Sequence, residues 1–240
     1  MSNALAGDIE QVHGAIERAG AGLVERDALV EVLFLAAVAG EHVLVIGPPG
    51  TAKSQVVRSV SRQFSGHYFE YLIGRFTEPN EIFGPVDLRK LRDGIVEIET
   101  AGMLPEADFV FLDEVFLGST AILNTLLGIL NEKTFRRGST AMDVPLRLCV
   151  GASNAMPAET SLAAFADRFL VRMFIDPIED GMLDDLLFTA WNHDHAATGQ
   201  SHSRMDIDVL DRLRVTCRDC DLRPVRPALA DAIRAMRSAG

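Results

Sequence analysis

Cysteine is scarce in this 240-residue chain, which holds only Cys149, Cys217 and Cys220. Any single-bridge scheme leaves one thiol unpaired, so the sequence does not describe a disulfide framework. No basic–apolar–small pattern typical of a signal peptide opens the chain. The longest apolar run, Val32 to Ala39, is far shorter than the about 20 residues that a bilayer span requires. We therefore expect a reduced, cytoplasmic protein without membrane insertion.

Basic charge is scarce as well. The chain has 23 lysines and arginines against 34 aspartates and glutamates, which gives a net charge of −11. Such a surface repels phosphate backbones unless a local basic patch compensates, so we expect no nucleic-acid partner. A single nucleotide site remains compatible with this charge, because Mg²⁺ and backbone amides can neutralise phosphates locally.

Apolar segments of strand length alternate with helical patterns along most of the chain. Residues 1–40, 53–64 and 119–131 show helical spacing of apolar side chains. Continuous apolar runs bounded by turn residues predict strands at 42–46, 68–73, 109–112, 146–152 and 170–175. This alternation of strand, loop and helix is typical of an α/β fold.

Two turn signals predict β-hairpins inserted into this pattern. Asp93-Gly94 is flanked by apolar residues, which places one hairpin near residues 86–98. Gly138 lies at the centre of a second candidate hairpin, residues 134–144.

The alternation of strand and helix patterns ends after Pro177. Residues 178–240 have a helical pattern interrupted by a polar loop. We therefore expect a core domain at 1–177 that carries the two hairpins, followed by a small helical lid at 178–240.

The strongest chemical signal is a Gly/Pro-rich turn between a predicted strand and a predicted helix. Its residues are Gly47, Pro48, Pro49, Gly50, Thr51, Ala52, Lys53 and Ser54, close to the phosphate-binding pattern G-x-x-x-x-G-K-[ST]. Backbone amides and the helix N-terminus would hold the phosphates, Lys53 would reach the β/γ-phosphates, and Ser54 would hold Mg²⁺. Ala52 replaces the usual glycine, and we expect it to need only ordinary helical angles. The alternative is a structural turn with a chance lysine.

Two carboxylates follow the apolar strand that ends at Leu112. Asp113 can complete the Mg²⁺ site, and Glu114 can orient and deprotonate an attacking water. The alternative is a pair of solvated acids at a strand end.

Two weaker signals follow later strands. Asn154 ends the strand at 146–152, where its amide can hold the same water or the γ-phosphate, although an Asn there is often only a turn residue. Arg168 precedes the last strand, where it serves either as an arginine finger or as a partner for Asp167.

Together these segments resemble the AAA+ ATPases, specifically the MoxR group in its RavA-like branch. Ala52 is the residue that this group carries at that position. The resemblance is carried by the segments Gly-Pro-Pro-Gly-Thr-Ala-Lys-Ser (47–54), Arg-Phe-Thr-Glu-Pro-Asn-Glu-Ile-Phe-Gly-Pro (75–85), Leu-Pro-Glu-Ala (104–107), Phe-Leu-Asp-Glu (111–114), Ala-Ile-Leu-Asn-Thr-Leu-Leu (121–127), Leu-Asn-Glu-Lys-Thr-Phe (130–135), Ala-Ser-Asn (152–154) and Asp-Arg-Phe (167–169). It is dense over residues 10–180 and loose beyond them.

The resemblance implies a P-loop NTPase fold, an αβα sandwich with a five-stranded parallel sheet and a helical lid. It implies ATP or ADP with Mg²⁺ bound between subunits of a hexameric ring. Lys53, Ser54, Asp113, Glu114 and Asn154 would form one subunit's part of the site, and Arg168 would reach the neighbouring subunit's nucleotide.

The resemblance also implies an arginine at the start of a lid helix that senses the nucleotide. Arg226 fits best and Arg223 is the rival, because Pro224 and Pro227 blur the register. Family members usually continue beyond this helix, whereas the sequence stops at Gly240. The lid is therefore either naturally short or cut short.

Three functional hypotheses remain open at this stage. The first is an ATPase acting as a chaperone-like assembly factor on a protein client, with a von Willebrand factor A (vWA) domain protein as partner. The second is a nucleotide-gated oligomeric binding module with little turnover. The third, a DNA-linked AAA+ protein, is opposed by the acidic charge. A zinc site formed by Cys217, Cys220, His193 and His195 is a weak alternative, because one C-x-x-C is unspecific.

Overall fold

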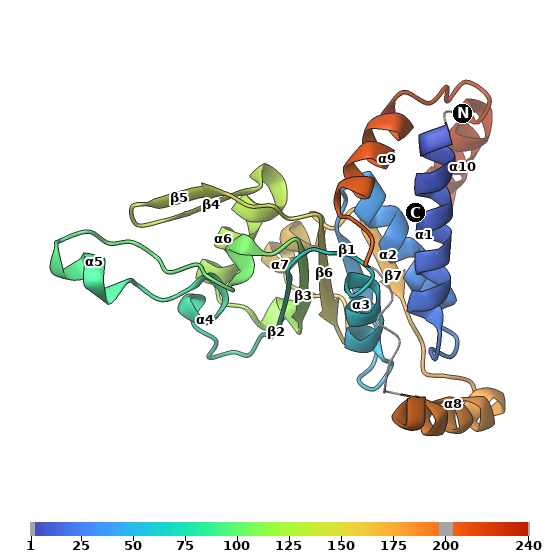
Figure 1. The fold of residues 1–240 in the computed structure, drawn as a ribbon, viewed down its shortest axis with the longest axis horizontal. Coiled ribbons are helices and arrows are strands. Elements are labelled where there is room, and N and C mark those ends of the chain that lie inside the picture. Colours follow the sequence, from blue (N-terminus) through green and yellow to red (C-terminus); the bar gives the residue numbers. More distant parts are fainter. Residues whose placement is uncertain (1–2, 197–203, 240) are drawn as a thin grey trace.

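The computed structural model describes residues 3–196 and 204–239. Five parallel strands form the central sheet in the order β2-β3-β6-β1-β7 (Figure 1). The strands are β1 (Val43–Ile46), β2 (Tyr68–Leu72), β3 (Phe109–Asp113), β6 (Leu148–Ser153) and β7 (Val171–Phe174). The predicted α/β class, with a five-stranded parallel sheet and helices after it, is confirmed.

Successive residues of the inner strands point to opposite faces of the sheet, which creates two cores. In β1, Val43 and Val45 belong to one core, while Leu44 and Ile46 belong to the other. All four side chains are buried. A strand apolar on both faces is typical of a parallel sheet covered by helices on both sides.

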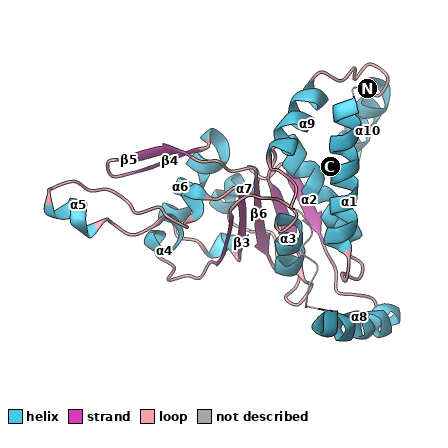
Figure 2. Cartoon of the chain, viewed as in Figure 1, coloured by secondary structure: helices cyan, strands magenta, loops and turns pink. Residues whose placement is uncertain are grey.

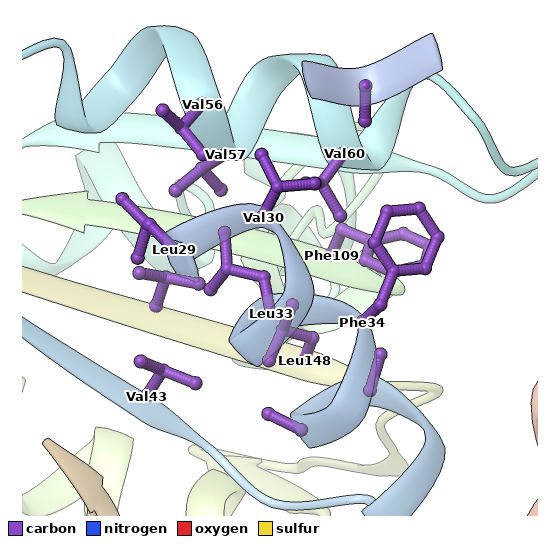
Figure 3. Packing of buried hydrophobic residues seen from close by; sticks show 14 of the residues in the cluster. Leu29, Val30, Leu33, Phe34, Val43, Val56, Val57, Val60, Phe109 and Leu148 are labelled. Atoms are coloured by element: carbon purple, nitrogen blue, oxygen red, sulfur yellow. The ribbon is translucent and has the colours of Figure 1, made fainter. Parts of the chain in front are cut away.

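The first core lies under four helices. These are α1 (Asn3–Gly20), α2 (Asp27–Ala39), α3 (Lys53–Ser61) and α9 (Asp208–Arg218). Gly40 ends α2 in the left-handed conformation, and its N–H donates to the carbonyls of Ala36 and Ala37. Figure 3 shows the packing of Leu29, Val30, Leu33, Phe34, Val43, Val56, Val57, Val60, Phe109 and Leu148.

The second core lies under helices on the opposite side of the strands, as Figure 2 shows for α4 and α6. It is covered by α4 (Pro79–Phe83), α6 (Thr120–Glu132) and α7 (Thr160–Ala166), with 3₁₀ turns at Leu104–Glu106 and Val115–Leu117. The Ser119 hydroxyl accepts the N–H of Ile122 and so caps α6, as its place before the apolar pattern predicts. The sheet is therefore the middle of three layers.

One of the two expected hairpins is present. Strands β4 (Thr134–Arg137) and β5 (Thr140–Asp143) pair antiparallel around Gly138. The expected hairpin near residues 86–98 is instead a loop with helix α5 (Leu88–Arg92), closed by the bridge between Val86 and Ile98. The Asp87 carboxylate accepts the N–H groups of Arg89 and Lys90, and this cap favours a helix over a strand.

The two inserts contact each other beyond the sheet. The Ser139 N–H donates to the carbonyl of Val96 over 3.0 Å, and the Ile98 N–H donates to the Thr140 hydroxyl over 2.8 Å. In Figure 1 both inserts extend from the same side of the molecule. They therefore form one projecting arm.

The segment after β7 is helical. It holds a 3₁₀ turn at Asp180–Met182, then α8 (Leu183–Ala196), α9 and α10 (Arg226–Ala239). Helix α9 buries Val209, Leu210 and Leu213 in the first core, whereas α10 leaves its apolar side chains exposed. Within residues 3–196 and 204–239, no helix has the length and hydropathy to cross a membrane.

Candidate functional site

The turn between β1 and α3 lies at the carboxyl edge of the sheet, where ligands bind in open α/β folds. Gly47 opens the turn against the end of β7, because a Cβ there would lie 2.5 Å from the carbonyl oxygen of Ile175. Gly50 takes a φ of +81°, which favours glycine. The glycines of the motif are therefore required by backbone geometry.

Ala52 corrects one expectation from the sequence. It has φ +63° and ψ 21°, in the left-handed region, and not the helical angles expected of it. The reason is that Ala52 is the N-cap residue, which directs the chain from the turn into α3, and α3 begins only at Lys53. The position therefore has the conformation for which the strict motif uses glycine.

Lys53 is the cation of this turn. It is 7% exposed, and its Nζ donates to the carbonyl oxygens of Gly47 at 2.6 Å and Pro48 at 3.0 Å. Ser54 follows in the first turn of α3 and is half-buried. An ammonium group over a glycine turn, next to a helix N-terminus, fits a phosphate group.

Three further polar side chains stand at the same edge of the sheet. Asp113 ends β3 and Glu114 follows it, both half-buried. Asn154 follows β6, the strand between β1 and β3, and its Nδ2 donates to Oε1 of Glu114 at 2.5 Å. The structure thus brings Glu114 and Asn154 into direct contact, which was not predicted from the sequence, because the sequence pattern did not give the order of the strands.

Arg168 stands on an anchored loop between α7 and β7. Its neighbour Phe169 is buried, and a Cβ on Gly151 of β6 would lie 3.1 Å from the Phe169 ring. Arg168 itself is exposed, and the Asp167 carboxylate accepts a hydrogen bond from Arg172. The alternative role of Arg168, an ion pair with Asp167, is therefore not found among the described residues, because Asp167 pairs with Arg172.

The two candidate lid arginines are placed differently. Arg226 begins α10 and is exposed, while Arg223 donates through Nε to Asp221 at 2.8 Å. Helix α10 lies at the upper right of Figure 1, away from α3. In the described part of the chain, neither arginine forms a hydrogen bond with the turn at 47–52.

The structure shows no metal site at the C-x-x-C pair within the described residues. Cys217 and Cys220 are free and exposed, and the described residues contain no group of three or more His, Cys, Asp or Glu side chains that can hold a metal. His193 and His195 fall in the part of α8 whose side chains lie outside the described set.

Sequence reasoning missed Arg26. This side chain is 5% exposed. Its Nε donates to the carbonyl of Thr51 at 3.0 Å. Thr51 lies in the turn at residues 47–52, which we call the phosphate-type turn because it resembles a phosphate-binding loop. An arginine just before an apolar helix gives no signal in a single sequence, because such residues are usually solvated. Its role becomes visible only from the fold.

Comparison with known proteins identifies the family. The family described as the MoxR domain in the MoxR–vWA–beta-propeller ternary systems matches residues 10–215. An uncharacterized protein of Methanocaldococcus jannaschii is 42% identical over 153 residues, covering 63% of this chain and 41% of that protein. The chaperone MoxR1 of Mycobacterium tuberculosis is 26% identical over 149 residues, covering 62% and 39%.

The fold has a match among solved structures. A structure described as a putative ATPase from Cytophaga hutchinsonii superimposes with a TM-score of 0.70 at 18% identity, covering 88% of this chain and 63% of that one. The chain spans about two-fifths of the length of the two curated relatives above. The chain therefore belongs to the MoxR family of AAA+ ATPases.

Proposed function

We propose that this chain binds ATP with Mg²⁺ and hydrolyses it to ADP and phosphate. The proposal rests on the group of polar side chains at the carboxyl edge of the sheet. There a buried ammonium, that of Lys53, lies over a glycine turn, and the contacting pair Glu114 and Asn154 follows strands of the same sheet. This set offers a cation for phosphate, oxygen ligands for a metal and a base for water.

Each residue has a role in this proposal. Lys53 and the amides of residues 47–52 hold the phosphates, and Ser54 and Asp113 hold Mg²⁺. When bound, Mg²⁺ neutralises charge on the phosphate oxygens. Glu114 orients and deprotonates water, while Asn154 positions Glu114 through the 2.5 Å hydrogen bond.

The site is completed between subunits of a homo-oligomer, which we propose is a hexameric ring. Arg168 supports this proposal because it is exposed and because buried Phe169 fixes the loop that carries it. From that place it serves as an arginine finger for the nucleotide of a neighbouring subunit.

The protein acts as a chaperone-like remodelling factor on a protein client, and a vWA domain protein is the proposed partner. The name of the matching family and the name of MoxR1 support this proposal. The RavA-like branch, a cytoplasmic location, a lid that begins near residue 177 and the sensing role of Arg226 belong to the same proposal.

The nucleotide-gated binding module is the second candidate function. One observation favours it: α10, which carries Arg226, lies away from α3 in Figure 1. A site without its lid arginine can bind ATP and assemble with little turnover.

Steady-state hydrolysis of Mg-ATP, measured per subunit over a wide range of protein concentration, separates the two functions. A rate that rises with concentration and then levels off is expected of a site completed in trans. A rate near zero at every concentration, with ATP still bound in calorimetry, favours the binding module. Absence of ATP binding contradicts both.

A further inference from the structure

Arg26 joins three separate backbone segments. Its Nε donates to the Thr51 carbonyl at 3.0 Å, its Nη1 to the Glu25 carbonyl at 2.7 Å and its Nη2 to the Asp176 carbonyl at 2.9 Å. Every nitrogen of the guanidinium is therefore bound to a backbone carbonyl. Thr51 lies in the phosphate-type turn, whereas Asp176 lies just beyond β7, where the chain leaves the sheet toward α8.

The beginning of the turn also touches the exit of β7. The Ile175 N–H donates to the Ile46 carbonyl at 2.8 Å. A side chain on Gly47 would lie 2.5 Å from the Ile175 carbonyl oxygen, so the two backbones are in van der Waals contact. The turn 47–52 thus meets the segment 175–176 at both of its ends, once directly and once through Arg26.

Glu25 extends the connection toward the lid. Its carboxylate accepts the N–H of Glu179 at 3.3 Å, one residue before the 3₁₀ turn that precedes α8. Glu25 has a φ of +55°, a conformation uncommon for a residue with a side chain. We call Glu25 and Arg26 together the clasp. It holds the turn on one side and residues 176–179 on the other.

The chemistry of Arg26 indicates a positional role. Burying a guanidinium is costly unless it is paired, yet each of its hydrogen bonds goes to a carbonyl dipole and none to a described carboxylate. A planar fork with donors in fixed directions sets the orientation of the carbonyls that it binds. Rotation of the Thr51 peptide therefore strains the Arg26–Asp176 contact.

We propose that Arg26 is a positioning residue that makes the path of the core–lid segment depend on the conformation of the phosphate-binding turn. The inference rests on the proposed function, because it takes ATP as the ligand of that turn. Lys53 now donates to two carbonyls of the turn and must redirect its donors to a phosphate group. When the backbone of the turn changes conformation, the hydrogen bonds of the clasp move residues 176–179 with it.

The chain carries its own reporter for the test. Trp191 is the single tryptophan of the sequence and belongs to α8, and its emission is the readout of the test. The titration uses Mg²⁺ with a non-hydrolysable ATP analogue, and calorimetry measures the affinity in parallel. The variants are Arg26→Gln, with the exposed Arg92→Gln of α5 as a matched control.

A second pair of variants covers the case in which Arg26→Gln does not fold. Glu25 is exposed, so Glu25→Ala removes the acceptor for the Glu179 N–H without opening the core. Glu25→Gln keeps an acceptor oxygen at the same place. Both substitutions leave a Cβ at positive φ, so the backbone strain is the same in the two.

The expected result is a change in Trp191 emission on binding in the unsubstituted chain and in Arg92→Gln and Glu25→Gln. Arg26→Gln and Glu25→Ala bind the analogue with less than about a tenfold loss of affinity but lose most of the emission change. An undiminished response in both variants overturns the inference and leaves the proposed function intact. The inference also falls if the unsubstituted chain binds without any emission change. If the unsubstituted chain does not bind, the proposed function itself fails.

Discussion

At the scale of single residues, most of the non-glycine residues with positive φ, a strained backbone conformation, lie at or beside the proposed site. The non-glycine residues with positive φ in the described part of the chain are Glu25, Ala52, Glu114 and Lys133. The first belongs to the clasp, the second to the phosphate-type turn and the third is the proposed base. Such strain persists where surrounding structure over-determines it, and functional sites are its usual location. The sequence predicted the chemistry of Ala52 and Glu114 but not their conformation, because φ depends on how the turn meets the helix.

The substitution Ala52→Gly tests this strain. A left-handed residue with a Cβ costs about 1–2 kcal/mol, while glycine adds about 0.5–1 kcal/mol of entropy cost on folding. The free energy of unfolding should therefore stay unchanged or rise by up to about 1.5 kcal/mol in urea titrations. A clear loss of stability would mean that Ala52 is not strained in solution.

Glu114→Gln tests the proposed base. Glutamine keeps an oxygen that accepts the Asn154 amide but cannot take a proton from water. Mg-ATP binding should remain, while hydrolysis should fall by about 10²–10⁴-fold. Calorimetry and phosphate release measure the two quantities. Weak binding in this variant would show that Glu114 is structural.

The buried His42 predicts a loss of stability in acid. Desolvation, with Lys133 and Arg214 nearby, lowers its pKa from 6.5 to about 4, and its Nδ1 accepts the Cys149 N–H. The unfolded chain therefore takes up this proton at higher pH than the folded chain does. The free energy of unfolding should fall as pH drops from about 6.5 to 4 and then level off, by a total of about 3 kcal/mol.

The control for this prediction is His42→Asn, whose Oδ1 can accept the same N–H without titrating. Chemical denaturation over this pH range should give a shallower slope for this variant than for the unsubstituted chain. Equal slopes would assign the pH dependence to the carboxylates instead.

At the scale of elements, hydrophobic pattern predicted what lies in the cores. All five strands of the sheet and the capped helix α6 follow runs that are visible in the sequence. The 86–98 insert escaped this reasoning because most of its apolar residues, among them Leu88, Leu91 and Val96, are exposed in the structure. Periodicity reports burial in a core, and an arm outside the core carries no such constraint. In this insert the Asp87 side chain caps α5 and so favours a helix over a strand.

The contact between β6 and the Arg168 loop predicts the effect of Gly151→Ala. The added Cβ would meet the Phe169 ring at 3.1 Å and Cγ1 of Val115 at 3.3 Å, so these side chains must move by a few tenths of an ångström. Overpacking of this kind costs about 1–3 kcal/mol, and hydrolysis should fall along with stability. Gly7→Ala in α1, where no atom lies within 4 Å, is the control and should retain both. Unchanged stability in Gly151→Ala would contradict the tight packing.

At the scale of the whole molecule, the parallel sheet places its polar residues at one edge although they are distant in sequence. The order β3-β6-β1 brings Glu114 and Asn154 together near the turn at Lys53. The strand ends indicate Asn154 only as a weak candidate for holding the same water as Glu114, and the assembly of the site is an expectation from the family resemblance. The sequence did not predict the clasp, because the bonds of Arg26 to Thr51 and Asp176 span 25 and 150 residues. Arg168 is exposed, and our proposal assigns it to the nucleotide site of a second copy of the chain.

Mixing two inactive variants tests the shared site most directly. Lys53→Ala removes the phosphate-binding cation but keeps Arg168, whereas Arg168→Ala keeps the turn but lacks the finger, whose loss costs about 10³–10⁵ in rate in other P-loop enzymes. The two are combined before assembly, and Mg-ATP hydrolysis is compared with that of each variant alone. The account predicts that the mixture recovers activity far above the sum of the separate rates. A mixture no more active than its parts, from variants that co-assemble, would contradict a site completed in trans.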